Sequence, residues 1–339
     1  MFDAAALESG AAMRYAWGMV TQSLKTMLWG VVDYAGLFPP AGLAMAPAAE
    51  AFARDRAGLH EWMLGRFVCP VSRLREFSNA AGALMPGTFA TSGYREHADI
   101  GDPWRISAIA DGVGGDGGPA AGLEADLETI IQFNTHHAGE DKGLAQVDCI
   151  EIKPPSAEFV DAAVEMLPDD LYPFFEVPQG QDPRGFVAAL AGNAAAAKLR
   201  TGGVTAGAFP STAEIAEFVN ACRLAEVPFK ATAGLHHPMR GAAPLTYEAG
   251  AATCVMHGFL NLFVASAFAF THKLEPTMIR ACLEESDAAA FIFTDEGLSW
   301  KRHVIDVTQI ARVREVFALS FGSCSFDDPV AELKKLGVM

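Results

Sequence analysis

The chain is short of positive charge, of paired cysteines and of membrane-length apolar runs. Lysine and arginine number 25 against 41 aspartate and glutamate residues, which gives a formal net charge of -16. Such an acidic surface repels phosphate backbones, so we expect no nucleic-acid partner. The six cysteines are scattered and none forms a C-x-x-C pair. This usage favours free thiols in a reducing compartment, and we expect a cytoplasmic protein.

No segment predicts secretion or membrane insertion. The first 25 residues include Asp3 and Glu8 and lack a basic start followed by an apolar block, so they do not resemble a signal peptide. Residues 254–270 are nearly all apolar, but their length is marginal for a membrane span. We interpret them as a buried strand followed by a buried helix. Residues 1–27 do not read as part of a fold, and we expect a leader that lies ahead of the natural start.

Short apolar segments alternate with helical ones along the chain. The expected strands are residues 30–34, 66–69, 106–111, 147–152, 173–177, 195–199, 228–231 and a segment that starts near Val255. A capping box that begins at Ser211 precedes apolar residues at helical spacing. The alternation is typical of an α/β protein, and eight units predict a TIM-type (β/α)8 barrel. An open doubly wound sheet is the alternative, but no G-x-G-x-x-G follows the first strand.

The predicted barrel covers residues 28–272. After Lys273 the pattern changes to a helix around 277–284, an apolar segment at 291–293 and a hairpin that ends near Val304. A last apolar segment, 321–326, precedes a short helix. We therefore interpret residues 273–339 as a C-terminal α+β extension that packs on the barrel.

Two lysines lie in apolar strand segments, although the chain has only nine lysines. Lys198 and Lys230 would be costly to bury unless they are paired or functional. Two ammonium groups in one cavity would depress each other's pKa, and a neutral lysine attacks carbonyls to form a Schiff base. The alternative is that each lysine pairs with Glu151 or Glu176 and only fills the barrel.

The segments that follow these lysines resemble a known family. Residues 198–203 (KLRTGG) and 229–235 (FKATAGL) are similar to the sixth and seventh strand ends of deoxyribose-phosphate aldolase, a class I aldolase with a barrel fold. In that family the Schiff-base lysine is followed by Thr-Gly at the spacing of Thr201 and Gly202. Its second lysine is followed by a glycine at the spacing of Gly234. A weaker similarity covers residues 30–271 in strand order.

The resemblance implies roles for three residues. Lys198 would attack the carbonyl, Lys230 would keep it neutral by charge repulsion, and Asp148 matches the family's acid–base aspartate. The chain departs from the family at its seventh strand, where His236-His237-Pro238 replace an arginine that helps to hold a phosphate. Residues 256–261 likewise replace the phosphate-binding glycines and serines of the eighth strand. The expected substrate is a small aldehyde, ketone or keto acid, and whether it is phosphorylated stays open.

Other polar residues are expected at the same mouth, because the carboxyl ends of parallel barrel strands converge there. We assign substrate binding to Asp33, Glu151, Lys153, Glu176, Arg200, Thr201, Gly202, Gly234, His236, His257 and Asn261. Arg200 and the backbone N–H groups of Gly202-Gly203 would suit an anion, although the glycines could equally serve a tight turn.

Two rival functions stay open. In the first, His236, His237 and His257 bind a divalent metal together with Glu176 or Asp148, although no H-x-H or H-E-x-x-H is present. In the second, the barrel is catalytically silent and binds a metabolite or a partner. For the Schiff-base reading we expect no cofactor and no metal. The oligomeric state, a homo-oligomer included, is not predicted.

Overall fold

Eight parallel strands pair in a closed ring in the computed structural model, which describes residues 20–88, 102–139 and 142–339. The ring has the order β1-β13-β7-β6-β5-β4-β3-β2, and β1 pairs with both β2 and β13. Its strands are β1 (Val32–Tyr34), β2 (Leu64–Pro70), β3 (Trp104–Ile109), β4 (Ala145–Ile152), β5 (Tyr172–Glu176), β6 (Ala196–Arg200), β7 (Phe229–Thr232) and β13 (Ala318–Ser323). The predicted TIM-type α/β barrel is confirmed.

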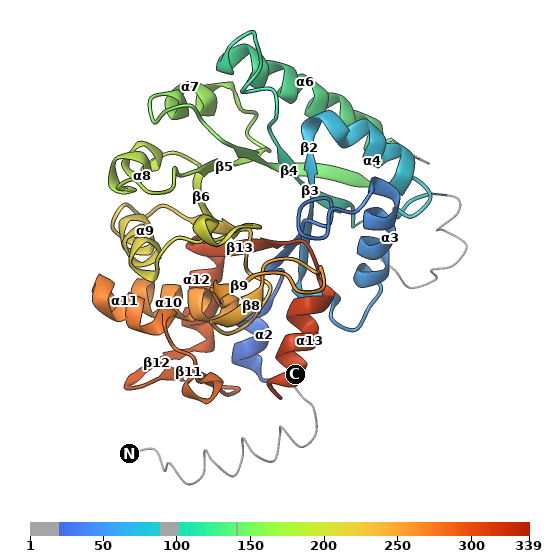
Figure 1. The fold of residues 1–339 in the computed structure, drawn as a ribbon. Coiled ribbons are helices and arrows are strands. Elements are labelled where there is room, and N and C mark those ends of the chain that lie inside the picture. Colours follow the sequence, from blue (N-terminus) through green and yellow to red (C-terminus); the bar gives the residue numbers. More distant parts are fainter. Residues whose placement is uncertain (1–19, 89–101, 140–141) are drawn as a thin grey trace.

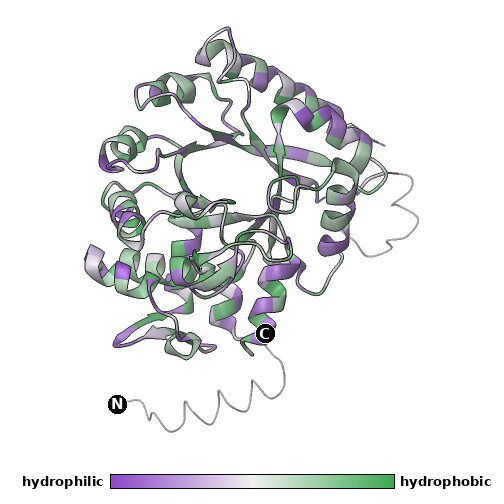
Figure 2. Ribbon diagram, viewed as in Figure 1, coloured by the Kyte–Doolittle hydropathy of each residue, from purple (hydrophilic) through white to green (hydrophobic). Residues whose placement is uncertain are grey.

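Helices surround the ring on its outside (Figure 1). Those that follow the first seven strands are α3 (Met45–Arg56), α4 (Leu74–Ala81), α6 (Pro119–His137), α7 (Phe159–Met166), α8 (Arg184–Leu190), α9 (Thr212–Leu224) and α10 (Phe259–His272). The expected capping box is present at the start of α9, where Ser211 and Glu214 exchange hydrogen bonds. Hydrophilic and hydrophobic residues alternate along the outer helices, as along α6 in Figure 2. None of the described helices is long and apolar enough to cross a membrane.

The expected eighth strand was wrong. The segment near Val255 forms β9 (Thr253–Met256), which pairs antiparallel with β8 (Gly241–Pro244) outside the ring. The apolar character of residues 254–270 belongs mainly to α10, which is buried continuously from Phe259 to Ala269. The eighth strand is instead β13, so the barrel does not end at residue 272.

The remaining elements between α10 and β13 form an insertion rather than a terminal extension. They are α11 (Pro276–Leu283), a three-stranded antiparallel sheet of β10 (Ile292–Phe293), β11 (Gly297–Trp300) and β12 (His303–Asp306), and then α12 (Val307–Val316). The helix α13 (Asp327–Lys335) follows β13. Of the described elements, only α13 follows the last strand of the ring in the chain.

Part of the expected leader also belongs to the fold. Helix α2 (Gln22–Leu28) buries Leu24, Met27 and Leu28 and packs against α12. The apolar spacing of these three residues gives the helix one buried face. The leader assigned to residues 1–27 therefore overlaps α2 from residue 22, and residues 1–19 lie outside the described part of the chain.

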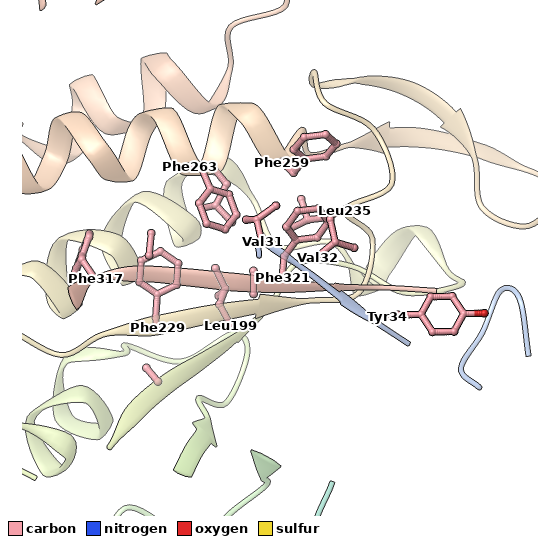
Figure 3. Close-up of a cluster of buried hydrophobic side chains, with 14 of the residues drawn as sticks. Val31, Val32, Tyr34, Leu199, Phe229, Leu235, Phe259, Phe263, Phe317 and Phe321 are labelled. Atoms are coloured by element: carbon pink, nitrogen blue, oxygen red, sulfur yellow. The ribbon is translucent and has the colours of Figure 1, made fainter. Parts of the chain in front are cut away.

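Side chains along each barrel strand point alternately outward, to the core beneath the helices, and inward, to the core inside the ring. On the outer side, Phe321 of β13 stacks on Phe259 of α10 at 5.1 Å between ring centroids and lies 5.9 Å from Phe263 (Figure 3). On the inner side, Cys149, Phe174 and Ala196 pack together from β4, β5 and β6. Because successive side chains of a strand point to opposite faces, the next inward positions on these strands are Glu151, Glu176 and Lys198.

The contact between β13 and α10 yields a prediction about the eighth strand. We expect Phe321→Ala to lower the free energy of unfolding by about 3–5 kcal/mol, since the ring is fully buried. Val304→Ala, on the exposed face of β12, should change it by no more than about 0.5 kcal/mol. Urea denaturation of both variants measures the difference. Equal effects would contradict a core position for β13.

Candidate active site

Lys198 and Lys230 lie side by side inside the barrel. They occupy matched positions of the parallel pair β6–β7, and their side chains are 7% and 1% exposed. Both ammonium groups bind the same carboxylate, that of Glu151 on β4. The expectation that the two lysines point into one interior is confirmed.

Glu151 is the centre of the buried charges. Its Oε2 lies 2.8 Å from Lys198 Nζ, and its Oε1 lies 2.7 Å from Lys230 Nζ. Ser107 on β3 donates a further hydrogen bond of 2.7 Å to Oε1. One carboxylate of β4 is therefore joined to three other strands of the ring, and its side chain is only 3% exposed.

The inner end of this network is closed by β1 and β13. Lys230 Nζ lies 2.6 Å from Asp33 Oδ2, which also accepts a hydrogen bond of 2.7 Å from Ser320. The other oxygen of Asp33 accepts from the backbone N–H of Arg66 at 3.0 Å. Lys230 also lies 5.0 Å from the centre of the Phe174 ring, within the range of a cation–π contact. These contacts hold Lys230 on several sides, which suits a fixed charge.

The outer end of the network reaches the mouth. Lys198 Nζ lies 3.0 Å from Glu176 Oε2, and Arg200 Nε lies 3.6 Å from Glu176 Oε1. Arg200 is 41% exposed, and Lys153, just beyond β4, is also exposed. Lys198 is therefore the lysine nearer to solvent-exposed groups.

The opposite charges of these groups stabilise the ionised forms of Glu151 and Lys230. Burial alone would raise the pKa of Glu151, but Lys198 and Lys230 outweigh it and hold that pKa well below its usual range. Burial alone would lower the pKa of Lys230, but Asp33 and Glu151 outweigh it and raise that pKa above its usual value. The sequence predicts that the two lysines depress each other's pKa. For Lys230 this prediction is wrong, because the Glu151 carboxylate lies between the two ammonium groups.

Asp148 lies apart from the lysines. It is the extra residue of a β-bulge, since Val147 and Cys149 pair with consecutive residues of β3. Its carboxylate binds Arg66 at 2.6 and 2.8 Å and lies 3.5 Å from Arg105. Its role as the acid–base group of the site stays a prediction, whereas Glu151 and Glu176 contact Lys198 directly.

Thr201, Gly202 and Gly234 join the ends of β6 and β7. The Thr201 hydroxyl donates to the backbone carbonyls of Thr232 and Ala233 at 3.1 and 2.5 Å. Gly234 has a φ of +75°, and a side chain there would lie 2.9 Å from the Gly202 Cα atom. These residues thus have a structural reason for their identity, and their assignment to substrate binding stays a prediction.

The side chains of His236, His257 and Asn261 contact groups other than the two buried lysines. His257 pairs with the Pro210 carbonyl at 2.8 Å, and Asn261 binds the backbone of Arg240, Cys282 and Glu285. His236 Nδ1 lies 3.9 Å from Cys324 Sγ. Within the described ranges no three His, Cys, Asp or Glu side chains are arranged to hold a metal ion. The rival metal site therefore gains no support from the positions of these residues.

Three groups of the site were not predicted from the sequence. Ser320 lies on β13, a strand that was assigned to an extension, and a serine such as Ser107 is ordinary in a strand. Arg66 was interpreted only as the start of an apolar strand, although a partly buried arginine at such a position indicates a carboxylate partner, here Asp148.

The pairing of Lys230 gives a second prediction. Lys230→Met leaves the buried carboxylates of Asp33 and Glu151 without their shared cation, so we expect a loss of about 3–5 kcal/mol in the free energy of unfolding. Lys335→Met removes an exposed lysine that pairs with Glu332 and should leave the urea midpoint unchanged. A stable Lys230→Met protein would show that the pair adds no stability.

The depressed pKa of Glu151 predicts a pH dependence. Its contribution to stability is present above the ordinary glutamate pKa of 4.5 and is lost as the pH falls below that value towards the folded pKa. We expect Glu151→Gln to be less stable than the parent protein at pH 7. The difference between the two proteins should shrink on acidification, as urea midpoints at pH 7 and pH 3 would show. Parallel pH curves would contradict the assignment.

Comparisons with known proteins identify no family for the chain. No protein-family model matches the chain, and searches of curated proteins and of solved structures found no match either. The TIM-barrel fold follows from the strand pairing, and the chemistry of the site has to be inferred from the side chains it contains.

Proposed function

We propose that the protein is a Schiff-base lyase or aldolase that acts on a small aldehyde, ketone or keto acid, with Lys198 as the nucleophile. The observation that carries the proposal is the position of Lys198, a buried amine on a barrel wall, held between the carboxylates of Glu151 and Glu176. The local resemblance of residues 198–203 and 229–235 to deoxyribose-phosphate aldolase supports the same assignment.

The first step requires a neutral amine. Lys198 would transfer one proton to Glu176, whose Oε2 lies 3.0 Å away, and the freed electron pair would attack the substrate carbonyl carbon. The oxygen of the resulting carbinolamine takes one proton from the nitrogen and one from Glu176, and it leaves as water. The product is a protonated Schiff base, whose positive charge would be stabilised by Glu151 in the place of the former ammonium group.

The second step uses this positive nitrogen as an electron sink. A carboxylate accepts the proton of the hydroxyl group two carbons from the imine carbon, the intervening C–C bond breaks, and an aldehyde leaves. The electron pair of that bond forms an enamine on the remaining fragment. Protonation of the enamine carbon and addition of water release the second product and the free amine of Lys198. Glu176 suits the proton transfers because it is the more exposed of the two carboxylates, at 13% against 3%.

Lys230 would act as a positioning residue. It binds the Glu151 oxygen that Lys198 does not use, and its own charge is held by Asp33. It therefore keeps Glu151 ionised and fixed, so that Glu176 is left to exchange protons with Lys198. This differs from the role expected from the sequence, in which Lys230 acts by direct repulsion.

The rival reading is a barrel in which both lysines only fill the interior, with a metabolite or no ligand at the mouth. The complete ion pairing of both ammonium groups is the observation that favours it. The two readings differ in one measurable property, the reactivity of Lys198 toward carbonyl compounds.

Reductive trapping separates them. Incubation with a panel of small aldehydes, ketones and keto acids plus borohydride should give a mass adduct on the peptide that contains Lys198. Lys198→Arg should abolish the adduct, because a guanidinium group stays protonated and cannot form the imine. Lys230→Arg should retain part of the trapping, since it preserves the charge next to Glu151.

Lys273→Arg is the matched control, because it changes an exposed lysine beyond α10 and should leave the adduct intact. An adduct on Lys230, or full trapping in Lys198→Arg, would refute the proposed nucleophile. No adduct with any compound of the panel would favour the barrel-filling reading.

A further inference from the structure

A small pocket lies beyond the ends of β6 and β7, the strands that carry Lys198 and Lys230. It measures about 90 Å³, and the residues after β6 and β7 line it at Gly203 and Gly234. Phe209 and Met256 contribute apolar walls, and Tyr247 and Asp328 contribute polar groups. Because Lys198 and Lys230 lie on the two strands that lead to Gly203 and Gly234, a substrate held here would extend from the lysine site. We call this space the side pocket.

The side pocket offers negative charge and hydrogen-bond groups. Asp328 on α13 accepts a hydrogen bond of 2.6 Å from the Tyr247 hydroxyl. No lysine or arginine occurs among the described residues that line the pocket. A phosphate or carboxylate placed there would meet a carboxylate without a compensating cation.

The two histidines of the pocket do not supply that cation. Burial lowers the pKa of His236, which favours its neutral form near pH 7. His237 Nδ1 lies 3.5 Å from Glu332, so any charge on its ring is already matched by a carboxylate. His236 Nδ1 lies 3.9 Å from Cys324 Sγ, which is also uncharged because burial raises the pKa of its thiol.

The exposed cations of the mouth, Lys153 after β4 and Arg200 at the end of β6, do not line the side pocket. Arg200 also faces the Glu176 carboxylate at 3.6 Å. The positive groups therefore serve the lysine site, and the side pocket is left to a neutral group.

We infer that the side pocket binds the uncharged, hydroxyl-bearing end of the carbonyl substrate and selects against phosphorylated or carboxylated analogues. Asp328 would accept a hydrogen bond from a substrate hydroxyl, and Phe209 and Met256 would pack against the C–H groups of its carbon chain. This inference rests on the proposed function, because it takes the carbonyl end to be bound at Lys198.

The test compares two aldehydes that differ only in charge. Borohydride trapping on Lys198 should be about tenfold or more faster with glyceraldehyde than with glyceraldehyde 3-phosphate. Asp328→Lys should remove or reverse this preference. Asp327→Lys makes the same charge change at the neighbouring residue, whose side chain is 74% exposed and pairs with Arg54, and it should keep the preference. Equal or faster trapping of the phosphate ester by the parent protein would overturn the inference, as would equal shifts in both variants.

Occupancy of the side pocket can be followed without Schiff-base chemistry. Isothermal titration calorimetry on the Lys198→Arg protein would measure this occupancy, because that variant cannot form the imine. Glycerol should bind and glycerol 3-phosphate should not; Asp328→Lys should remove this difference and Asp327→Lys should keep it. Binding of glycerol without any borohydride trapping in the parent protein would refute the lysine chemistry and keep the pocket assignment. Equal binding of both compounds would refute the pocket assignment whatever happens at Lys198.

Discussion

A single carboxylate, that of Glu151, receives the ammonium groups of two neighbouring strands, and the interior of the barrel is arranged around it. Three acidic side chains, Asp33, Glu151 and Glu176, contact three basic ones, Lys198, Lys230 and Arg200. Buried charges are costly unless each is paired and hydrogen-bonded, and here the two signs balance. Only a closed ring brings strands β1, β4, β5, β6 and β7 close enough to complete this set.

Exposure rises steadily along the same chain of contacts. The side chain of Lys230 is 1% exposed, Lys198 is 7%, Glu176 is 13% and Arg200 is 41%. The inner lysine is therefore held as a permanent charge, and the outer one adjoins groups that can meet solvent and ligand. The two lysines thus differ in their carboxylate partners and in their exposure, and the proposal that Lys198 is the nucleophile rests on this difference.

The sequence was sufficient for the architecture and for most of the central charges. Seven of the eight strands were located, because short apolar segments between capped helices are a strong local signal. The eighth was misplaced because α10 is buried from Phe259 to Ala269 and has no polar face there. Its apolar residues continue those of β9, so the sequence showed no boundary between the two elements. The acid–base role of Asp148 came from a resemblance in strand order and stays a prediction, because such a resemblance reveals neither the bulge at Asp148 nor its pairing with Arg66.

The contacts of the side pocket lay beyond sequence reasoning altogether. His236 and Cys324 are separated by 88 residues, and Tyr247 and Asp328 by 81. No local pattern links such pairs, since they meet only because β13 returns to close the ring beside β7.

The pairing of β1 with β13 also sets an order of events during synthesis. The first strand is made early, but its neighbour on one side is completed only at Ser323, almost three hundred residues later. Contacts of such long sequence separation form late, and a chain emerging from the ribosome folds its earlier part first. Until then Asp33 has no Ser320 beside it and the ring has two open edges. The charged interior can therefore be completed only after β13 has been made, and until then the growing chain exposes two unpaired strand edges.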